Sequence, residues 1–150
     1  MMIRVVVQTA AFDLAGEMER LSQISENVGG MSVFMGQVRA QGDGLESLTL
    51  EHYPGMTEKV LTTLAEEAGT RFSLLGCTVV HRVGTMRVGE PIVFVGTASG
   101  HRAEALQATS FLIDRLKTGA PFWKCERFTD GRKRWVEARD TDDEAAALWD

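Results

Sequence analysis

The sequence has 150 residues, of which 44% are hydrophobic and 25% are charged, and its formal net charge is -5 at pH 7. This length predicts a single compact domain over residues 1–150, and these proportions of hydrophobic and charged residues exclude a disordered or fibrous chain. The negative charge argues against non-specific binding to nucleic acid or acidic membranes, so any site for an anion has to be local.

Runs of β-branched and alternating apolar residues predict strands, and apolar residues spaced by three or four predict helices. Because several predicted strands are consecutive, without a regular alternation of strands and helices, we expect an α+β fold. In chain order the predicted elements are a strand at 3–8, a helix at 13–25, strands at 31–39 and 45–53, a helix at 54–71, strands at 74–83 and 91–99 with a short connection between them, a helix at 102–118, a hairpin of 122–128 with 134–137, and a short helix beyond residue 140.

Residue chemistry also predicts how the helices begin, end and pack. Asp13 is a candidate N-cap of the first helix, Pro54 is suited to open the second, and Gly119 is suited to cap the end of the third. The spacing of apolar residues predicts which side chains share one face. In the second helix these are Met56, Val60, Leu64 and Ala68, and in the third they are Leu106, Thr109, Ile113 and Leu116.

The segment Ser99-Gly100-His101-Arg102 lies where a predicted strand passes into a predicted helix. Free N–H groups at a helix N-terminus favour a phosphate or carboxylate, and Arg102 can add a bidentate contact. The alternative is that Ser99 caps the helix while His101 and Arg102 are solvated. The pattern alone leaves these two interpretations about equally supported.

Lys117 and Lys124 flank the rigid turn Gly119-Ala120-Pro121 and the aromatic pair Phe122-Trp123. A lysine in the last turn of a helix is ordinarily a surface residue that complements the helix dipole. Two aromatic residues and a proline beside paired lysines instead indicate a walled, partly dry pocket. There, like charge and desolvation lower a lysine pKa and make the group useful as an acid, base or nucleophile.

Other residues give weaker signals. Arg39 follows a predicted strand and is a candidate ligand for an anion, although a solvated arginine is commoner. The cysteines and histidines have no spacing typical of a zinc site, so no metal is expected, and Cys125 beside Lys124 is only weak evidence for a reactive thiol. The two cysteines, Cys77 and Cys125, and the lack of a signal-peptide pattern or a membrane-spanning run favour a cytoplasmic protein.

The length of the third helix constrains how its two ends can be used. Arg102 and Lys117 are separated by about 22 Å along one helix at 1.5 Å per residue. One small-molecule site within one subunit can hardly use both residues. If both serve the same site, a second subunit has to supply one of them, which predicts a symmetric dimer with two shared sites.

Six sequence blocks, taken in order, resemble the large, catalytic subunit of molybdopterin synthase, the MoaE family. The match covers almost the whole chain, and the block with Lys117 and Lys124 is specific. The blocks are LEHYPGM at 50–56, HRVG at 81–84, VGEPIVFV at 88–95, SGHR at 99–102, LKTGAPFWK at 116–124 and WVEAR at 135–139.

The resemblance implies an α/β-hammerhead-type α+β fold, with a mixed, largely antiparallel sheet and a β-hairpin subdomain. It also implies a sulfurtransferase that inserts two sulfurs into cyclic pyranopterin monophosphate to form the dithiolene of molybdopterin. The sulfur comes from the thiocarboxylated Gly-Gly tail of a small sulfur-carrier subunit. The implied assembly is a homodimer of this chain within a heterotetramer, and no cofactor is required of the chain itself.

Position by position, the resemblance implies roles for seven residues. Lys117 and Lys124 match the active-site lysines, and we expect Lys117 to be the main acid/base or covalent group while Lys124 tunes it and binds an anion. The implied substrate-binding residues are Arg39, His101, Arg102, Arg139 and Phe34. Ala40, Ile113 and Cys125 depart from the residues common in the family, which bears on the pocket wall and the channel for the tail.

Two other functions fit the same residues. The cationic pocket can belong to a non-catalytic dimeric module that only holds a pterin or nucleotide phosphate. The chain can also be a structural dimer that docks another protein through an apolar groove, in which case no phosphate binding is expected.

Overall fold

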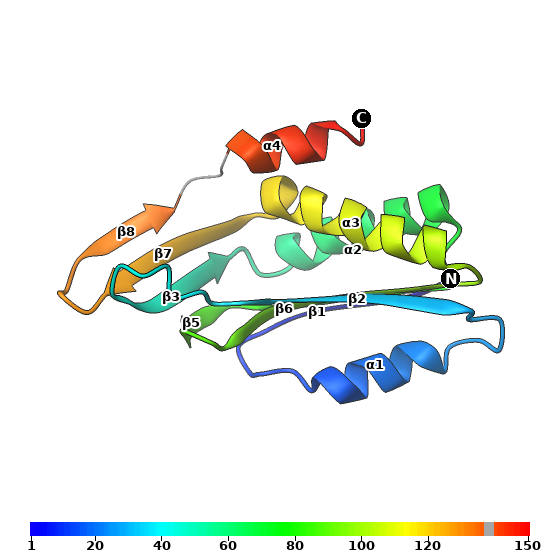
Figure 1. Cartoon of the computed structure of the whole chain (residues 1–150), viewed down its shortest axis with the longest axis horizontal. Helices are drawn as coiled ribbons and strands as arrows, with labels where there is room; N and C mark the ends of the chain where they lie inside the picture. The colour runs from blue at the N-terminus through cyan, green and yellow to red at the C-terminus, as the bar shows by residue number, and fades with distance from the viewer. Residues whose placement is uncertain (137–139) are drawn as a thin grey trace.

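The computed structural model describes residues 1–136 and 140–150, and the predicted α+β class is confirmed (Figure 1). Within those residues, no helix is long and apolar enough to cross a membrane. The elements are β1 (Met2–Gln8), α1 (Leu14–Ser22), β2 (Gly30–Gln37), β3 (Leu45–His52), α2 (Met56–Phe72), β4 (Gly76–Arg82), β5 (Gly84–Arg87), β6 (Pro91–Ser99), α3 (Arg102–Gly119), β7 (Phe122–Phe128), β8 (Lys133–Val136) and α4 (Asp140–Ala147).

The larger sheet is mixed and largely antiparallel, as expected. Its strand order is β1-β4-β6-β2, in which β1 is parallel to β4 and the other neighbours are antiparallel. Figure 1 shows α2 and α3 on one face of this sheet and α1 on the other. The main core lies between the sheet and α2 and α3, and its largest fully buried side chains include Phe111, Leu61 and Leu112.

The helices bury different residues from those that the apolar spacing predicted. In α3, Leu106 is 60% exposed and the buried face carries Ala105, Ala108, Thr109, Phe111 and Leu112. In α2, Met56 is exposed and the buried positions are Thr57, Leu61, Ala65, Ala68, Gly69 and Phe72. The predicted stripes were therefore wrong at Leu106 and Met56, because small and polar residues occupy much of each buried face.

Replacing Phe111 by alanine is expected to lower the free energy of unfolding by about 3–5 kcal/mol. The Phe111 ring is fully buried, with its centroid 5.6 Å from the rings of both Phe72 and Trp149, so its removal leaves a cavity among three packed segments. Urea denaturation measures the loss. Leu106→Ala on the exposed side of the same helix is the control, and a similar loss in both variants would contradict this packing.

A smaller antiparallel sheet has the order β5-β3-β7-β8 and its own core, in which Leu50, Met86 and Phe128 are buried. The predicted hairpin of β7 and β8 is confirmed, with Gly131 in its turn at a φ of 89°. The predicted connection after β4 contains an additional strand, β5. Gly84 has a φ of 87°, which allows the chain to turn sharply out of the larger sheet and pair with β3.

The helix ends also differ in detail from the predictions. Asp13 occupies the N-cap position of α1, but its side chain makes no capping hydrogen bond. Helix α2 begins after Gly55 rather than at Pro54, and the Gly55 N–H donates to the Glu58 carboxylate at 2.6 Å. Gly119 belongs to α3 itself and is followed by Ala120 in an extended conformation, so it does not form a left-handed cap.

Candidate functional site

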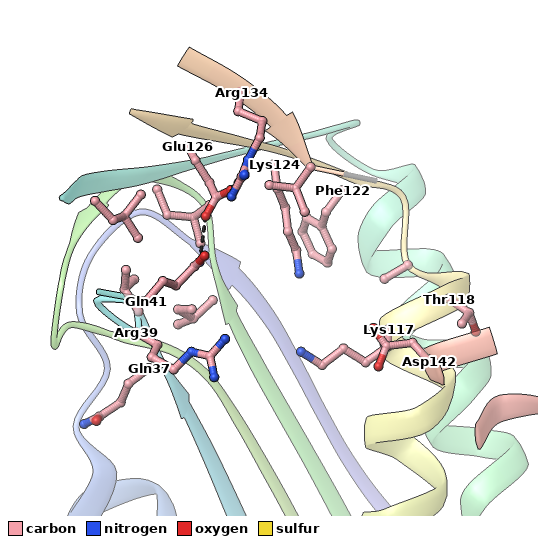
Figure 2. A pocket seen from close by; sticks show the side chains of 16 residues that line it. Gln37, Arg39, Gln41, Lys117, Thr118, Phe122, Lys124, Glu126, Arg134 and Asp142 are labelled. Atoms are coloured by element: carbon pink, nitrogen blue, oxygen red, sulfur yellow. Dashed lines mark hydrogen bonds and ion pairs between the residues drawn. The ribbon is translucent and has the colours of Figure 1, made fainter. Parts of the chain in front are cut away.

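A cavity of about 490 Å³ opens where the C-terminal end of α3 meets the smaller sheet and the end of β2 (Figure 2). The strands β2, β3, β6, β7 and β8, the helices α3 and α4, and the chain after β2 all contribute to its wall. Four cationic side chains line it, although the chain as a whole is acidic, together with amide, hydroxyl and carboxylate side chains. The polar residues that line it are Gln37, Arg39, Gln41, Lys117, Thr118, Lys124, Glu126, Arg134 and Asp142.

The two lysines reach this cavity from different elements. Lys117 lies in the last turn of α3, and Lys124 lies in β7, where it pairs with Leu50 of β3. Figure 2 shows both amines pointing into the same space, with Arg39 entering it from the chain after β2. The structure therefore brings together three of the residues that the sequence singled out.

The aromatic wall differs from the prediction that both aromatic residues border the lysines. Phe122 lines the cavity, but Trp123 is not among its lining residues. Alternate residues of a strand point to opposite faces. The ring of Trp123 packs edge-on against Tyr53, with the centroids 4.4 Å apart, and it is 39% exposed.

Lys124 is half-buried, and its pKa is lowered from the usual value of 10.5. The main cause is desolvation, because burial disfavours the ammonium form, and the positive charge of Lys117 acts in the same direction. The negative charge of Asp142 partly opposes both effects. At a given pH, a larger fraction of Lys124 is therefore in the uncharged amine form than of a surface lysine.

A buried carboxylate organises the side of the cavity opposite α3. Glu126, which is 3% exposed, accepts hydrogen bonds from Gln41 Nε2 at 2.7 Å and from Arg134 Nε at 2.9 Å and Nη2 at 2.6 Å. Gln41 has a φ of 62° and belongs to the loop that also carries Arg39. The contact therefore ties this loop to β7. Sequence reasoning missed all three residues. Gln41 and Glu126 are 85 positions apart, whereas Glu126 and Arg134 are direct partners across the predicted hairpin, whose register could have indicated this pair.

A second cavity of about 330 Å³ adjoins the first, and both are lined by Lys117, Lys124 and Phe122. Phe34, predicted as a substrate-binding residue, lines this second cavity and is 38% exposed. His81 also lines it and was not predicted as a site residue, although it lies in the HRVG block. Burial lowers the His81 pKa to about 4, and the nearby positive charges of Lys124, Lys117 and His52 add to this effect.

The lowered His81 pKa predicts a pH dependence of stability. Unfolded His81 takes up a proton near pH 6.5, whereas folded His81 does so only near pH 4, so protonation in this range favours the unfolded chain. The contribution of His81 to the free energy of unfolding is fully present above about pH 6.5 and is lost as the pH falls to about 4. It amounts to about 3 kcal/mol at 1.36 kcal/mol per pH unit.

Urea denaturation between pH 7 and pH 4 measures this effect. The unfolding free energy of the wild-type protein should fall more steeply with decreasing pH than that of His81→Phe. The other titrating groups, including His52, are present in both proteins, so the difference in slope isolates His81. Equal slopes would show that His81 is protonated alike in the folded and unfolded chains.

His101 and Arg102 lie at the opposite end of α3 from Lys117, and both are exposed. Neither lines the two cavities, as the length of the helix predicted. His101 is the N-cap residue and makes no side-chain capping bond. Ser99 is buried at the end of β6 and does not occupy the cap position, so the alternative in which Ser99 caps the helix is wrong in that respect, although His101 and Arg102 are exposed as that alternative expected.

The remaining candidates are Arg139, the two cysteines and a metal site, and none of them places a further described residue in the cavity wall. Arg139 lies outside them. Cys77 is buried, which raises its thiol pKa to about 12, and Cys125 is half-buried beside the cavity rather than in its wall. In the part of the chain that the structure describes, no three or more histidine, cysteine, aspartate or glutamate side chains are grouped so that they could hold a metal ion.

Comparison with known proteins agrees with the fold and with the sequence blocks. The family model described as MoaE protein matches residues 7–119. A molybdopterin synthase catalytic subunit from Pasteurella multocida is 48% identical over 149 residues, covering 98% of each chain, and one from Pseudomonas aeruginosa is 49% identical over 146 residues, covering 96% of this chain and 97% of its own.

The solved structures include a molybdopterin biosynthesis MoaE protein from Burkholderia ambifaria, which is 44% identical. It superposes with a TM-score of 0.85 over 99% of this chain and 98% of its own. The resemblance found in the sequence blocks is confirmed by these matches over nearly the full length. The chain belongs to the MoaE family.

Proposed function

We propose that this chain is the catalytic subunit of a molybdopterin synthase and that its reaction takes place at Lys117 and Lys124. The family membership supports the reaction. The observation that supports the site is the convergence of Lys117, Lys124 and Arg39 on one cavity of an otherwise acidic chain (Figure 2). Such a cluster suits a substrate that carries a phosphate and a carrier tail that ends in an anion.

The reaction transfers sulfur without a change of oxidation state. The thiocarboxylate sulfur of the carrier forms a bond to a carbon of cyclic pyranopterin monophosphate, and a substrate oxygen leaves with protons. Water then cleaves the bond between that sulfur and the terminal carbonyl of the carrier, whose tail becomes a carboxylate. A second charged carrier repeats the transfer at the neighbouring carbon. Each round needs a group that accepts a proton from water and another proton for the leaving oxygen.

Lys124 is best suited to this proton transfer. Burial and Lys117 lower its pKa, so its ammonium can give a proton to the leaving oxygen, and the amine that results can accept a proton from the attacking water, which restores the ammonium. Lys117 supplies positive charge to the anionic reactants. This division of roles reverses the expectation from the sequence, in which Lys117 was the main participant and Lys124 the tuning residue.

The substrate-binding roles extend to a second copy of the chain. Arg39 and Phe34 line the cavities of the same subunit, whereas His101 and Arg102 are too distant and are proposed to come from the partner subunit. Arg139 is proposed to bind substrate on the basis of the family resemblance alone. The assembly is a homodimer that binds two small sulfur-carrier subunits, and residues 1–150 act as one domain of a cytoplasmic enzyme.

Mixing the pure protein with cyclic pyranopterin monophosphate and a thiocarboxylated carrier tests the proposed function. Molybdopterin is expected to accumulate, with two carriers consumed for each product. A non-catalytic module would bind the precursor without forming molybdopterin, and a structural dimer would not bind it. Calorimetric titration with the precursor, run in parallel, separates these two alternatives from the enzyme.

A further inference from the structure

His81 has a fixed orientation inside the second cavity. The residue is 7% exposed and its ring stacks on Phe122, with the centroids 4.0 Å apart and the planes 22° apart. The Nδ1 atom of His81 lies 2.9 Å from the backbone carbonyl oxygen of Arg82, the next residue of β4. Stacking and this hydrogen bond together leave the ring little freedom to turn.

The contact with Arg82 determines the tautomer of His81. A carbonyl oxygen can only accept a hydrogen bond, so Nδ1 has to carry the hydrogen. The ring is neutral above about pH 4, because burial and the nearby lysines disfavour its protonation. A neutral imidazole with a hydrogen on Nδ1 has a free lone pair on Nε2, which makes Nε2 a hydrogen-bond acceptor.

Acceptors are scarce in this cavity. Most of the residues that line it are apolar, and Lys117 and Lys124 contribute only donors in their charged form. Apart from a lysine in its uncharged form, only Gln37 and His81 among the described side chains that line it have a nitrogen or oxygen that can accept a hydrogen bond. Figure 2 shows the Gln37 amide turned away from the two lysines. A bound N–H group inside this second cavity therefore has His81 as a side-chain acceptor.

We propose that His81 is a further substrate-contacting residue of this site and that its Nε2 accepts a hydrogen bond from an N–H group of a bound reactant. This inference rests on the proposed function, which supplies two sources of such a group. One is a backbone amide near the end of the carrier tail, and the other is an N–H group of the pterin ring. In either case an N–H group taken out of water loses free energy unless it finds an acceptor.

Nitrogen-15 NMR of the wild-type dimer, labelled at histidine, tests this contact without altering the fold. The free protein should show His81 with hydrogen on Nδ1 and none on Nε2. Two unreactive titrations follow, one with a carrier that ends in an ordinary carboxylate and one with the precursor alone. The His81 Nε2 resonance should shift in one of them, and that titration identifies the source. A hydrogen on Nε2, or an unmoved resonance at saturation in both titrations, would overturn the proposal.

Two variants provide a kinetic test with a matched control. His81→Gln and His81→Phe both lose the hydrogen bond to Arg82, but glutamine offers an acceptor close to the position of Nε2. We expect kcat/KM for molybdopterin formation to be about tenfold lower in His81→Phe than in His81→Gln at similar melting temperatures. Equal values would overturn the proposal. If the wild-type protein formed no molybdopterin, the proposed function would fail, and the NMR titrations would still decide the role of His81.

Discussion

Replacing Lys124 by alanine should lower kcat for molybdopterin formation by about 10²- to 10⁴-fold, the usual contribution of a positioned acid or base. Lys124 is half-buried, has a lowered pKa and faces Lys117 in the cationic cavity. Lys124→Arg keeps the positive charge and the hydrogen-bond donors, but a guanidinium does not exchange protons near neutral pH. We therefore expect Lys124→Arg to bind the precursor nearly normally and to have a kcat as low as that of Lys124→Ala.

Two further variants separate the loss of the Lys124 proton-transfer group from the effect of removing any lysine. Lys59 is exposed on α2 and lines neither cavity, so Lys59→Ala should leave kcat unchanged. Lys117→Ala should weaken the binding of anions more than it slows the chemical step. A low kcat in Lys117→Ala together with a nearly normal kcat in Lys124→Ala would show that the two lysines have the opposite roles.

The pH dependence of kcat gives an independent measure of the same group. If the Lys124 amine is the base, the rate rises as the pH increases through its pKa in the bound complex. Because that pKa is lowered, the rise should occur below the usual lysine value of 10.5. Asp142 holds the pKa up, so Asp142→Asn should move the rise to still lower pH. A rise that stayed in place in Asp142→Asn would argue against Lys124 as the titrating group.

Local sequence patterns predicted most of the elements, because strands and helices differ in the spacing of their apolar residues. The hairpin of β7 and β8 could be predicted from its Asp130-Gly131 turn, and the long helix α3 from its composition and flanking glycines. Strand β5 was missed. It has four residues, and its only fully buried side chain is Met86, so its pairing with β3 depends on the turn at Gly84.

The site was predictable only where the relevant residues are close in sequence or match a family block. Lys117 and Lys124 are separated by one turn, and their positions on either side of it indicated a shared pocket. His81 and Phe122 stack across 41 positions of sequence, and Gln41 and Glu126 are 85 positions apart. No periodicity reports such pairs, because tertiary packing alone brings β4 and the loop after β2 to the lysines.

Combining two inactive variants in one dimer should restore activity. If His101 and Arg102 serve the cavity of the partner subunit, Lys124→Ala and Arg102→Ala damage different halves of each shared site. In a heterodimer of these two variants, one site receives both altered residues and the other site receives neither. We therefore expect about half of the wild-type rate per dimer, compared with almost none for either parent.

The measurement requires two differently tagged chains, co-expressed and purified through both tags, and then supplied with precursor and charged carrier. The matched control is a heterodimer of Lys117→Ala and Lys124→Ala. Both residues line the same cavity of one chain, so each of its two sites keeps one damaged lysine and the rate should not exceed the mean of the two parents. Recovery in the control as well would indicate subunit exchange or contamination by wild-type protein. If the heterodimer of Lys124→Ala and Arg102→Ala did not recover, the proposed sharing of each site between two chains would be wrong.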